Sequence, residues 1–266
     1  MLGAVIGDIV GSRFEFNNYR HTDFEFFHPR CRFTDDSVLT LALCRALLNT
    51  RADRALLAAE AVRCMQEVGR PYDDCGYGGR FFGWMYSDNP QPYNSFGNGS
   101  AMRVSGCAWA AQTLDEVKEM SLAVTAVSHN HPEGIKGAEA TAVAAFMARQ
   151  GASKEEIRAC IERDYYHLDF TLDAIRPTYQ FNEICQDTVP QALQAFMEST
   201  GFEDAIRLAI SLGGDSDTLG AITGAVAEAF YGVPRALREQ ALSYLDKRLL
   251  SIVEDFEAVY PAPIAP

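Results

Sequence analysis

Gly213-Gly214-Asp215-Ser216-Asp217-Thr218 separates an apolar run that ends at Leu212 from another that extends from Leu219 to Phe230. Paired glycines permit a tight turn with positive φ, and an Asp or Ser after them can cap the first free amides of a helix. A cap needs one such residue, whereas this stretch offers several side-chain oxygens. On an ideal helix Asp215 and Asp217 lie about 200° apart, so they converge only if Asp215 stays in the turn. That arrangement suits a bound cation.

A second oxygen-rich stretch, Thr34-Asp35-Asp36-Ser37, precedes the apolar run from Val38 to Leu43. Carboxylates gathered in one place raise each other's pKa unless a cation compensates them. Neither stretch contains His or Cys, and hard divalent cations prefer carboxylate, hydroxyl and water oxygens. We therefore predict Mg²⁺, with Mn²⁺ as the alternative.

Other interpretations of these stretches can be compared with the sequence. Both could be ordinary helix caps with spare acids, each stabilised by the helix dipole by about 0.3 to 1 kcal/mol. An EF-hand loop that starts at Asp215 would need an oxygen ligand at 219 and Glu at 226, but the chain has Leu219 and Val226. An aspartyl-phosphate phosphatase motif normally follows the first strand of an α/β fold, whereas this Asp-x-Asp lies late, between helical patterns.

The composition excludes several classes of protein. The chain of 266 residues has a formal charge of −13 and no basic stripe, which disfavours general nucleic-acid binding. No apolar run approaches the roughly 20 residues of a membrane span, and Met1–Val10 contains Asp8 and lacks a basic region. Seven cysteines form no CxxC pair, which indicates reduced thiols. We expect one domain, residues 1–266, that lies in the cytoplasm and does not bind membranes. We also expect a monomer, since no heptad repeat is present.

Helical periodicity dominates the chain, and no alternating strand pattern competes with it, so the predicted fold class is all-α, an orthogonal helical bundle. The last predicted helix contains a break. Helices are predicted near 36–49, 53–68, 101–112, 115–127, 133–150, 154–163, 188–199, 202–212, 217–231 and 234–258. Asp53, Asp115 and Ser153 are the predicted N-caps.

The N-terminal stretch spaces Gly3, Gly7 and Gly11 four residues apart. On a helix they form one smooth stripe, which lets another helix or a ligand approach the backbone. Asp8 and Glu15 lie close to this stripe and need partners. Asp8 could cap a helix or pair with a nearby Arg.

Two segments, 70–100 and 164–187, lack a helical pattern and are rich in aromatic residues. Loops this long in a compact domain are usually functional. The first ends in a glycine-rich turn, 95–100, whose amides can hold a pyrophosphate at a helix start. His129 is a candidate substrate contact, and a packed structural histidine is the alternative. His129 with His131 lacks a third well-placed ligand for zinc.

These motifs resemble, in order and nearly from end to end, the ADP-ribosylglycohydrolase family, which includes enzymes that remove ADP-ribose from dinitrogenase reductase. The matching stretches are Gly7-Asp8-Ile9-Val10-Gly11-Ser12-Arg13-Phe14-Glu15, Thr34-Asp35-Asp36-Ser37, Gly97-Asn98-Gly99-Ser100-Ala101-Met102-Arg103, Ser128-His129 and Gly214-Asp215-Ser216-Asp217-Thr218.

The resemblance implies an all-helical domain with two Mg²⁺ ions in a cleft. The metal ligands would be Thr34, Asp35, Asp36, Asp215, Asp217 and Thr218. Substrate would be bound by Asn98, Gly99, Ser100, Met102, Arg103 and His129.

The implied reaction is hydrolysis at the anomeric carbon of the ribose, which releases ADP-ribose from a protein side chain, by analogy arginine, or from a related ADP-ribosyl compound. A water activated by the metal and a carboxylate would attack an oxocarbenium-like centre. Glu15 and Asp36 are the candidates for the carboxylate that accepts the proton. Two alternatives stay open: a non-catalytic protein that binds ADP-ribose, and a hydrolase of another nucleotide N-glycoside.

Overall fold

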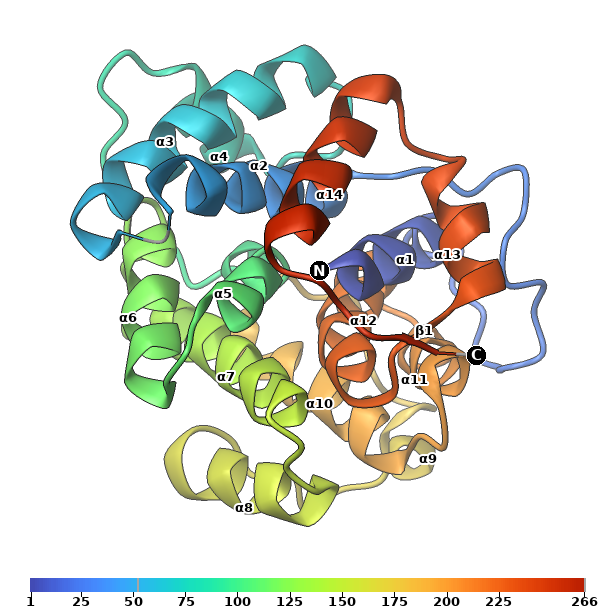
Figure 1. The fold of residues 1–266 in the computed structure, drawn as a ribbon. Coiled ribbons are helices and arrows are strands. Elements are labelled where there is room, and N and C mark those ends of the chain that lie inside the picture. The colour runs from blue at the N-terminus through green and yellow to red at the C-terminus, as the bar shows by residue number, and fades with distance from the viewer. Residues whose placement is uncertain (52, 266) are drawn as a thin grey trace.

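The computed structural model describes residues 1–51 and 53–265 and consists almost entirely of helices (Figure 1). The α-helices are α1 (Leu2–Gly11), α2 (Asp35–Thr50), α3 (Arg54–Gly69), α4 (Gly79–Tyr86), α5 (Ser105–Ala110), α6 (Leu114–Thr125), α7 (Pro132–Arg149), α8 (Lys154–Asp164), α9 (Leu172–Ile175), α10 (Val189–Glu198), α11 (Phe202–Ile210), α12 (Ser216–Tyr231), α13 (Arg235–Leu242) and α14 (Lys247–Val259). Short 3-10 helices are η1 (Arg70–Tyr72), η2 (Asn98–Ser100) and η3 (Cys185–Asp187). The all-α prediction is confirmed.

Two expectations about regular structure need correction. Segment 70–100 contains α4, whose eight residues mix aromatic residues with glycine and so give too short a pattern to reveal the helix. The helix predicted at 101–112 begins only at Ser105, because Ala101 to Val104 form a turn after η2. One short parallel pair, β1 (Val233–Pro234) with β2 (Ile264–Ala265), was not expected.

The predicted caps have mixed outcomes. The side chains of Asp53 and Ser153 accept hydrogen bonds from the first turns of α3 and α8, as predicted. Asp115 lies inside the first turn of α6, where Thr113 is the cap instead. The predicted break in the last helix separates α13 from α14.

The glycine stripe of α1 packs directly against α12. A β-carbon added to Gly7 would lie 1.9 Å from the carbonyl oxygen of Gly220, and one added to Gly3 would lie 2.1 Å from that of Gly224. Neither helix can carry a side chain at these positions without moving apart, since real β-carbons are not found closer than 3.0 Å. This contact brings the end of α1, which Glu15 follows, beside the start of α12, where Asp215 and Asp217 lie (Figure 1).

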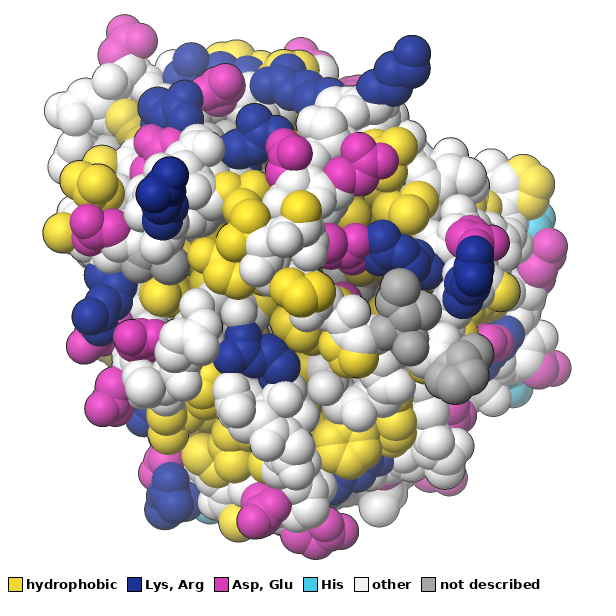
Figure 2. Space-filling model, in the orientation of Figure 1, with side chains coloured by type: hydrophobic (Ala, Val, Ile, Leu, Met, Phe, Trp, Pro, Cys, Tyr) yellow, Lys and Arg dark blue, Asp and Glu magenta, His cyan; other side chains and the backbone are white. Residues whose placement is uncertain are grey.

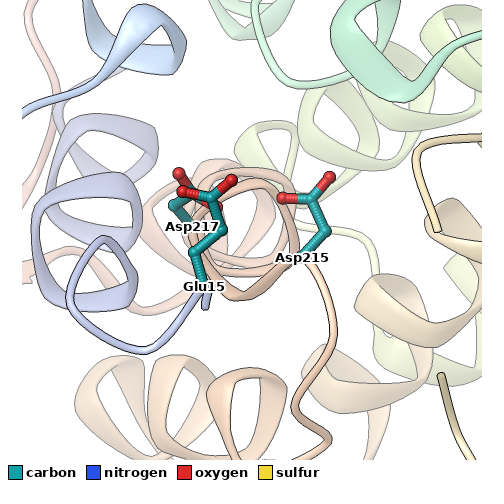
Figure 3. A group of neighbouring side chains, drawn as sticks. All are labelled: Glu15, Asp215 and Asp217. Atoms are coloured by element: carbon teal, nitrogen blue, oxygen red, sulfur yellow. The ribbon is translucent and has the colours of Figure 1, made fainter. Parts of the chain in front are cut away.

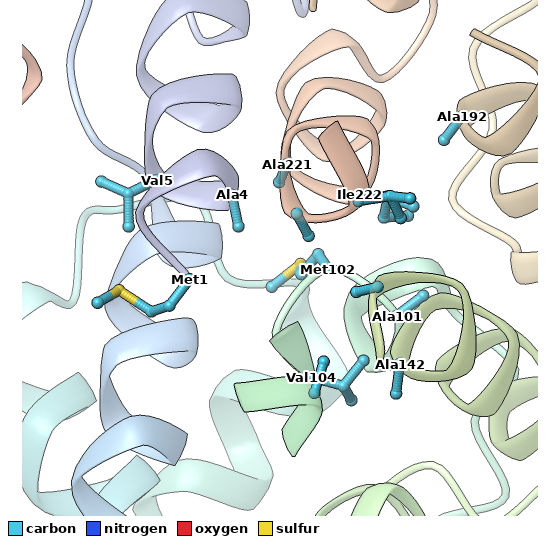
Figure 4. Close-up of a cluster of buried hydrophobic side chains, with 14 of the residues drawn as sticks. Met1, Ala4, Val5, Ala101, Met102, Val104, Ala142, Ala192, Ala221 and Ile222 are labelled. Atoms are coloured by element: carbon cyan, nitrogen blue, oxygen red, sulfur yellow. The ribbon is translucent and has the colours of Figure 1, made fainter. Parts of the chain in front are cut away.

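Small and medium apolar side chains fill the space between these two helices and their neighbours. Figure 4 shows Ala4 of α1 and Ala221 and Ile222 of α12 facing Met102 and Ala142 from the middle of the chain. All five are buried. The core therefore supports α1, α12 and the segment around Met102 together.

One face of the molecule carries both basic and acidic side chains (Figure 2). On the face shown in Figure 2, basic and acidic side chains alternate and no basic stripe forms. Among the described residues, no helix is long and apolar enough to cross a lipid bilayer.

Candidate active site

A cavity of about 260 Å³ collects residues from both ends of the chain and from its middle. One end is acidic, and the other carries hydrogen-bond donors and positively charged arginine side chains. Its lining is Glu15, Asp35, Asp36, Leu39, Gly76, Gly78, Gly79, Arg80, Phe81, Tyr93, Ser95, Gly97, Asn98, Gly99, Met102, Arg103, His129, Glu183, Asp215, Asp217 and Thr218.

Three carboxylates converge at the acidic end. Glu15, Asp215 and Asp217 each offer an oxygen, and these oxygens lie within 4.8 Å of one another. Figure 3 shows the three side chains gathered at the N-terminal end of α12, with Glu15 reaching in from the segment after α1. Such a group of oxygens has the size and chemistry that suit a hard divalent cation.

The turn before α12 places the Asp215 carboxylate at the cavity instead of over the first amides of the helix. Gly213 and Gly214 have φ of 73° and 72°, which confirms the predicted positive-φ turn. The capping expected of Asp215 or Ser216 is wrong, because α12 has no side-chain cap hydrogen bond. The amide nitrogen of Asn98 instead donates to Asp215 Oδ2 at 2.7 Å. The plain-cap interpretation therefore does not explain Asp215.

Asn18 fastens the same turn to the segment that carries Glu15. Its side-chain oxygen accepts a hydrogen bond from the Gly214 amide at 2.8 Å. Its side-chain nitrogen donates to the carbonyl oxygens of Phe14, Glu15 and Gly214. The side chain of Asn18 thus links the backbone at Glu15 to the backbone just before Asp215.

Asp8 of α1 organises the start of α2. Its carboxylate is fully buried and accepts hydrogen bonds from the amide and hydroxyl of Thr34 and from the amide and hydroxyl of Ser37. Of the two alternatives for Asp8, pairing with an arginine is not made among the described residues, since Arg13 donates to the carbonyl oxygen of Glu25 instead. Asp35 and Asp36 lie between the two anchored residues and face the cavity. Asp8 therefore positions both carboxylates without lining the cavity.

Burial raises the pKa of five carboxyl groups at the acidic end. The pKa of Asp35 rises to about 8 through burial and the charges of Asp8 and Asp215. Burial and the charge of Asp215 raise the pKa of Glu15 to about 7. Burial, followed by neighbouring carboxylates, raises the pKa of Asp36 and Asp217 well above the ordinary value. Burial also raises the pKa of Asp215.

These residues fit a divalent cation. Asp36 Oδ1 is buried and has no hydrogen-bond partner among the described residues, while Oδ2 accepts one from Thr218 Oγ1 at 3.4 Å. A buried carboxylate oxygen without a partner is costly unless a cation or a proton compensates it. A cation would compensate the negative charge of all the converging carboxylates and would lower their raised pKa values.

The other end of the cavity is formed by Arg103, His129 and the turn around η2. Arg103 is fully buried and donates from Nη2 to Ser128 Oγ at 2.8 Å and to His129 Nδ1 at 3.2 Å. Burial lowers the pKa of His129 well below its ordinary value, and the charge of Arg103 lowers it further. This end therefore presents a neutral imidazole beside a buried guanidinium.

The sequence profile of the ADP-ribosylglycohydrolase family matches residues 1–264. The chain belongs to this family. Membership confirms the resemblance drawn from the motifs and identifies the chain as one of a family of metal-dependent hydrolytic enzymes.

Three named relatives match most of this chain. It is 29% identical over 260 residues to the ADP-ribosylarginine hydrolase Tri1 of Pseudomonas putida (strain GB-1), covering 88% of this chain and 70% of the relative. It is 27% identical over 256 residues to the ADP-ribosyl-dinitrogen reductase glycohydrolase of Rhodospirillum rubrum, covering 87% and 84%. Human ADP-ribosylhydrolase ARH3 is 25% identical over 330 residues, with 94% and 90% covered.

A solved structure shares the fold. A chain described as an ADP-ribosylglycohydrolase-related protein complex superposes with a TM-score of 0.69 and 23% identity, covering 97% of this chain and 95% of that one. The all-helical architecture is therefore that of a known ADP-ribosylglycohydrolase-related structure.

Most of the residues predicted from the sequence line the cavity of this ADP-ribosylglycohydrolase, and two lie behind it. Those that line it are Glu15, Asp35, Asp36, Asp215, Asp217, Thr218, Asn98, Gly99, Met102, Arg103 and His129. Thr34 lies behind the lining, where its hydroxyl donates to Asp8. Ser100 is fully buried, and its hydroxyl donates to the carbonyl oxygens of Gly97 and Gly134. Both support the wall instead of facing the cavity.

Several cavity residues of this ADP-ribosylglycohydrolase were not predicted. Gly76, Phe81 and Tyr93 come from segment 70–100, and the exposed Glu183 comes from segment 164–187. Their abundance of aromatic residues and the length of both segments were the only signals. The expectation that these segments would be functional agrees with their place in the cavity wall.

Proposed function

We propose that this chain hydrolyses the glycosidic bond that joins the ribose of ADP-ribose to a protein side chain, and that arginine is the modified residue. The observation that carries the proposal is a single cavity with a carboxylate-rich end and a cationic, amide-rich end. A ribose with its free hydroxyls fits the first end when cations are present, and a pyrophosphate fits the second. The arginine linkage rests on the name of the Pseudomonas putida relative.

We propose two divalent cations, Mg²⁺ or Mn²⁺, held by Asp35, Asp36, Asp215, Asp217 and Thr218, with Glu15 beside them. Thr34 belongs to the proposed set, although its hydroxyl is already engaged by Asp8. When bound, the cations would polarise the ribose hydroxyls and neutralise the converging carboxylates.

The chain's own groups would then divide the remaining work. Glu15 is partly exposed at the cavity wall and makes no side-chain hydrogen bond to the described residues, so it is free to accept a proton from an attacking water. Asp36 is 3% exposed and is bonded to Thr218, which makes it the second candidate for that role. Asn98 would hold Asp215 in position, and the buried Arg103 would support the opposite end of the cavity.

We propose that one chain in the cytoplasm is the acting unit. The sequence contains no heptad repeat that would require a partner helix, which supports a monomer. The seven cysteines are free, and six of them are buried, which suits a reducing compartment.

The test is mass-spectrometric detection of free ADP-ribose released from proteins modified on arginine or on serine, with Mg²⁺, with Mn²⁺ and with EDTA. Release from the arginine-linked protein in a metal-dependent manner is expected. Release from the serine-linked protein alone would contradict the proposed linkage. Tight binding of ADP-ribose without release from either protein would identify a binding protein instead of an enzyme.

A further inference from the structure

Arg103 is an unusual buried cation. Its side chain is fully buried, its guanidinium carbon lies 5.2 Å from the ring centroid of Phe81, and no ion pair links it to a carboxylate within the described residues. Its Nε and Nη1 atoms are buried without hydrogen-bond partners. Keeping such a charge in place costs free energy, so its position calls for a functional explanation.

The two hydrogen bonds that Arg103 makes determine which nitrogen of His129 carries the proton. A guanidinium can only donate, so His129 Nδ1, 3.2 Å from Nη2, must be an acceptor. The hydroxyl of Ser128 lies 2.8 Å from both groups, so it accepts from Arg103 and donates to the same Nδ1. A neutral imidazole with an accepting Nδ1 carries its hydrogen on Nε2.

His129 Nε2 faces the glycine turn of the cavity. β-carbons built on Gly97 and on Gly99 would each lie 3.6 Å from this nitrogen, so the absence of side chains there leaves it open. Burial and the charge of Arg103 both lower the pKa of His129, which keeps the ring neutral. The N–H group is therefore a fixed donor directed at whatever occupies the space beside the turn.

We infer that Arg103 is a positioning residue that, directly and through Ser128, holds His129 in its Nε2–H tautomer and so presents a neutral donor to a ligand oxygen at Gly97 and Gly99. The identity of that oxygen, in the pyrophosphate or a ribose of ADP-ribose, rests on the proposed function. The tautomer itself does not.

The first measurement is a long-range ¹H–¹⁵N NMR spectrum of metal-free, ligand-free protein labelled with ¹⁵N-histidine, in which His129→Gln assigns the signal. We expect an unprotonated Nδ1 and a protonated Nε2 in the wild type. Arg103→Met should populate the opposite tautomer, because the hydroxyl of Ser128 can then accept as well as donate. Arg103→Lys, which also only donates, should keep the wild-type tautomer.

Arg149→Met is the matched control, since Arg149, like Arg103, lies over a phenylalanine ring. Unlike Arg103, it lies outside the cavity lining and donates to backbone carbonyl oxygens. This variant should leave the His129 signal unchanged. A wild-type signal with protonated Nδ1 overturns the inference, and so does an identical spectrum in Arg103→Met. The wild-type spectrum decides the first point even if Arg103→Met does not fold.

Calorimetric binding of ADP-ribose tests the consequence. His129→Gln keeps an N–H near the Nε2 position and should bind within about threefold of wild type, whereas His129→Asn and Arg103→Met should each weaken binding about tenfold or more. When His129→Gln is already present, adding Arg103→Met should change the affinity for ADP-ribose much less than it does in the wild type. A full effect there would mean that Arg103 acts on the ligand directly and overturns the positioning role. The expected tautomer without any ADP-ribose binding would instead contradict the proposed function.

Discussion

Asp8 accepts two hydrogen bonds from Thr34, one from its amide at 2.9 Å and one from its hydroxyl at 2.7 Å. We expect Asp8→Asn to destabilise the protein by about 1 to 3 kcal/mol, because an asparagine must direct an N–H group at a donor of Thr34 or Ser37. Urea unfolding measures this loss. Asp255→Asn, which removes an exposed ion pair with Arg45, is the control and should change stability by less than about 1 kcal/mol. Equal losses in both variants would contradict an organising role for Asp8.

Gly7→Ala should be strongly destabilising. Its β-carbon would lie 1.9 Å from the Gly220 carbonyl oxygen, so α1 and α12 must separate at a cost of about 1 to 3 kcal/mol or more. Gly83→Ala in α4 is the matched control, because nothing lies within 4 Å of its β-carbon. That variant should be neutral or stabilising by up to about 1 kcal/mol, since alanine favours helix. Thermal unfolding compares the two, and similar melting temperatures would argue against a tight helix contact.

Asp217→Asn should abolish turnover and leave the fold intact. It removes one of three converging carboxylates, so we expect kcat to fall at least about 100-fold while repulsion in the metal-free protein is relieved. ADP-ribose release and Mg²⁺ titration by calorimetry give the two readouts. Asp173→Asn, whose side chain is 89% exposed, should behave like wild type. Full turnover in Asp217→Asn would remove this residue from the active site.

The metal-free protein should lose stability as the pH rises. The pKa of Asp35 is raised from 3.8 to about 8 and that of Glu15 from 4.5 to about 7, so the folded state binds more protons than the unfolded state between these limits. Their stabilising contribution is complete below about pH 4, falls progressively as the pH rises, and is lost once the pH has passed the folded-state pKa values of about 7 and 8. The melting temperature in EDTA should therefore fall from pH 5 to pH 8.

Mg²⁺ should raise the melting temperature more at pH 8 than at pH 5, because fewer protons then compete for the carboxylates. Asp35→Asn should reduce the fall seen in EDTA, which separates this group from the general effect of net charge. A melting temperature in EDTA that stays constant or rises with pH in the wild type would contradict the assignment of raised pKa values.

Gly99→Ala should weaken ADP-ribose binding without unfolding the protein. The added β-carbon would lie 3.6 Å from His129 Nε2 and 4.0 Å from Met102 Sδ, which is ordinary contact, but it would cover the donor. We expect about a tenfold loss of affinity, the size of one lost hydrogen bond to a charged group. Calorimetry with ADP-ribose and a thermal melt provide the comparison. Unchanged affinity would place the ligand away from the glycine turn.

The long helices were predictable because their apolar periodicity and caps are local. α2, α3, α7 and α12 each begin and end within one or two residues of the prediction. α4 was missed because eight residues contain too few turns for a period to emerge. The start of α5 was misplaced because the tight turn at 101–104 is as apolar as the helix that follows it.

The site was predictable where residues of one chemistry adjoin in sequence, as at Asp35 and Asp36. It was not predictable where a partner comes from a distant irregular segment. Asp8 and Thr34 are 26 residues apart in the sequence, and Asn98 and Asp215 are 117 residues apart. Glu183 enters the cavity wall only because the folded segment 164–187 reaches the turn at Gly97.

The pairing of α1 with α12 also fixes when the site can form during synthesis. Residues 2–11 leave the ribosome early, whereas their glycine-lined partner begins at Ser216. Until then Asp8 can hold the start of α2, but the face of α1 that packs against α12 stays uncovered and the cavity lacks two of its three converging carboxylates. A nascent chain therefore carries an incomplete, inactive site with exposed apolar surface on α1 until α12 has emerged, and this favours chaperone binding to α1 during that interval.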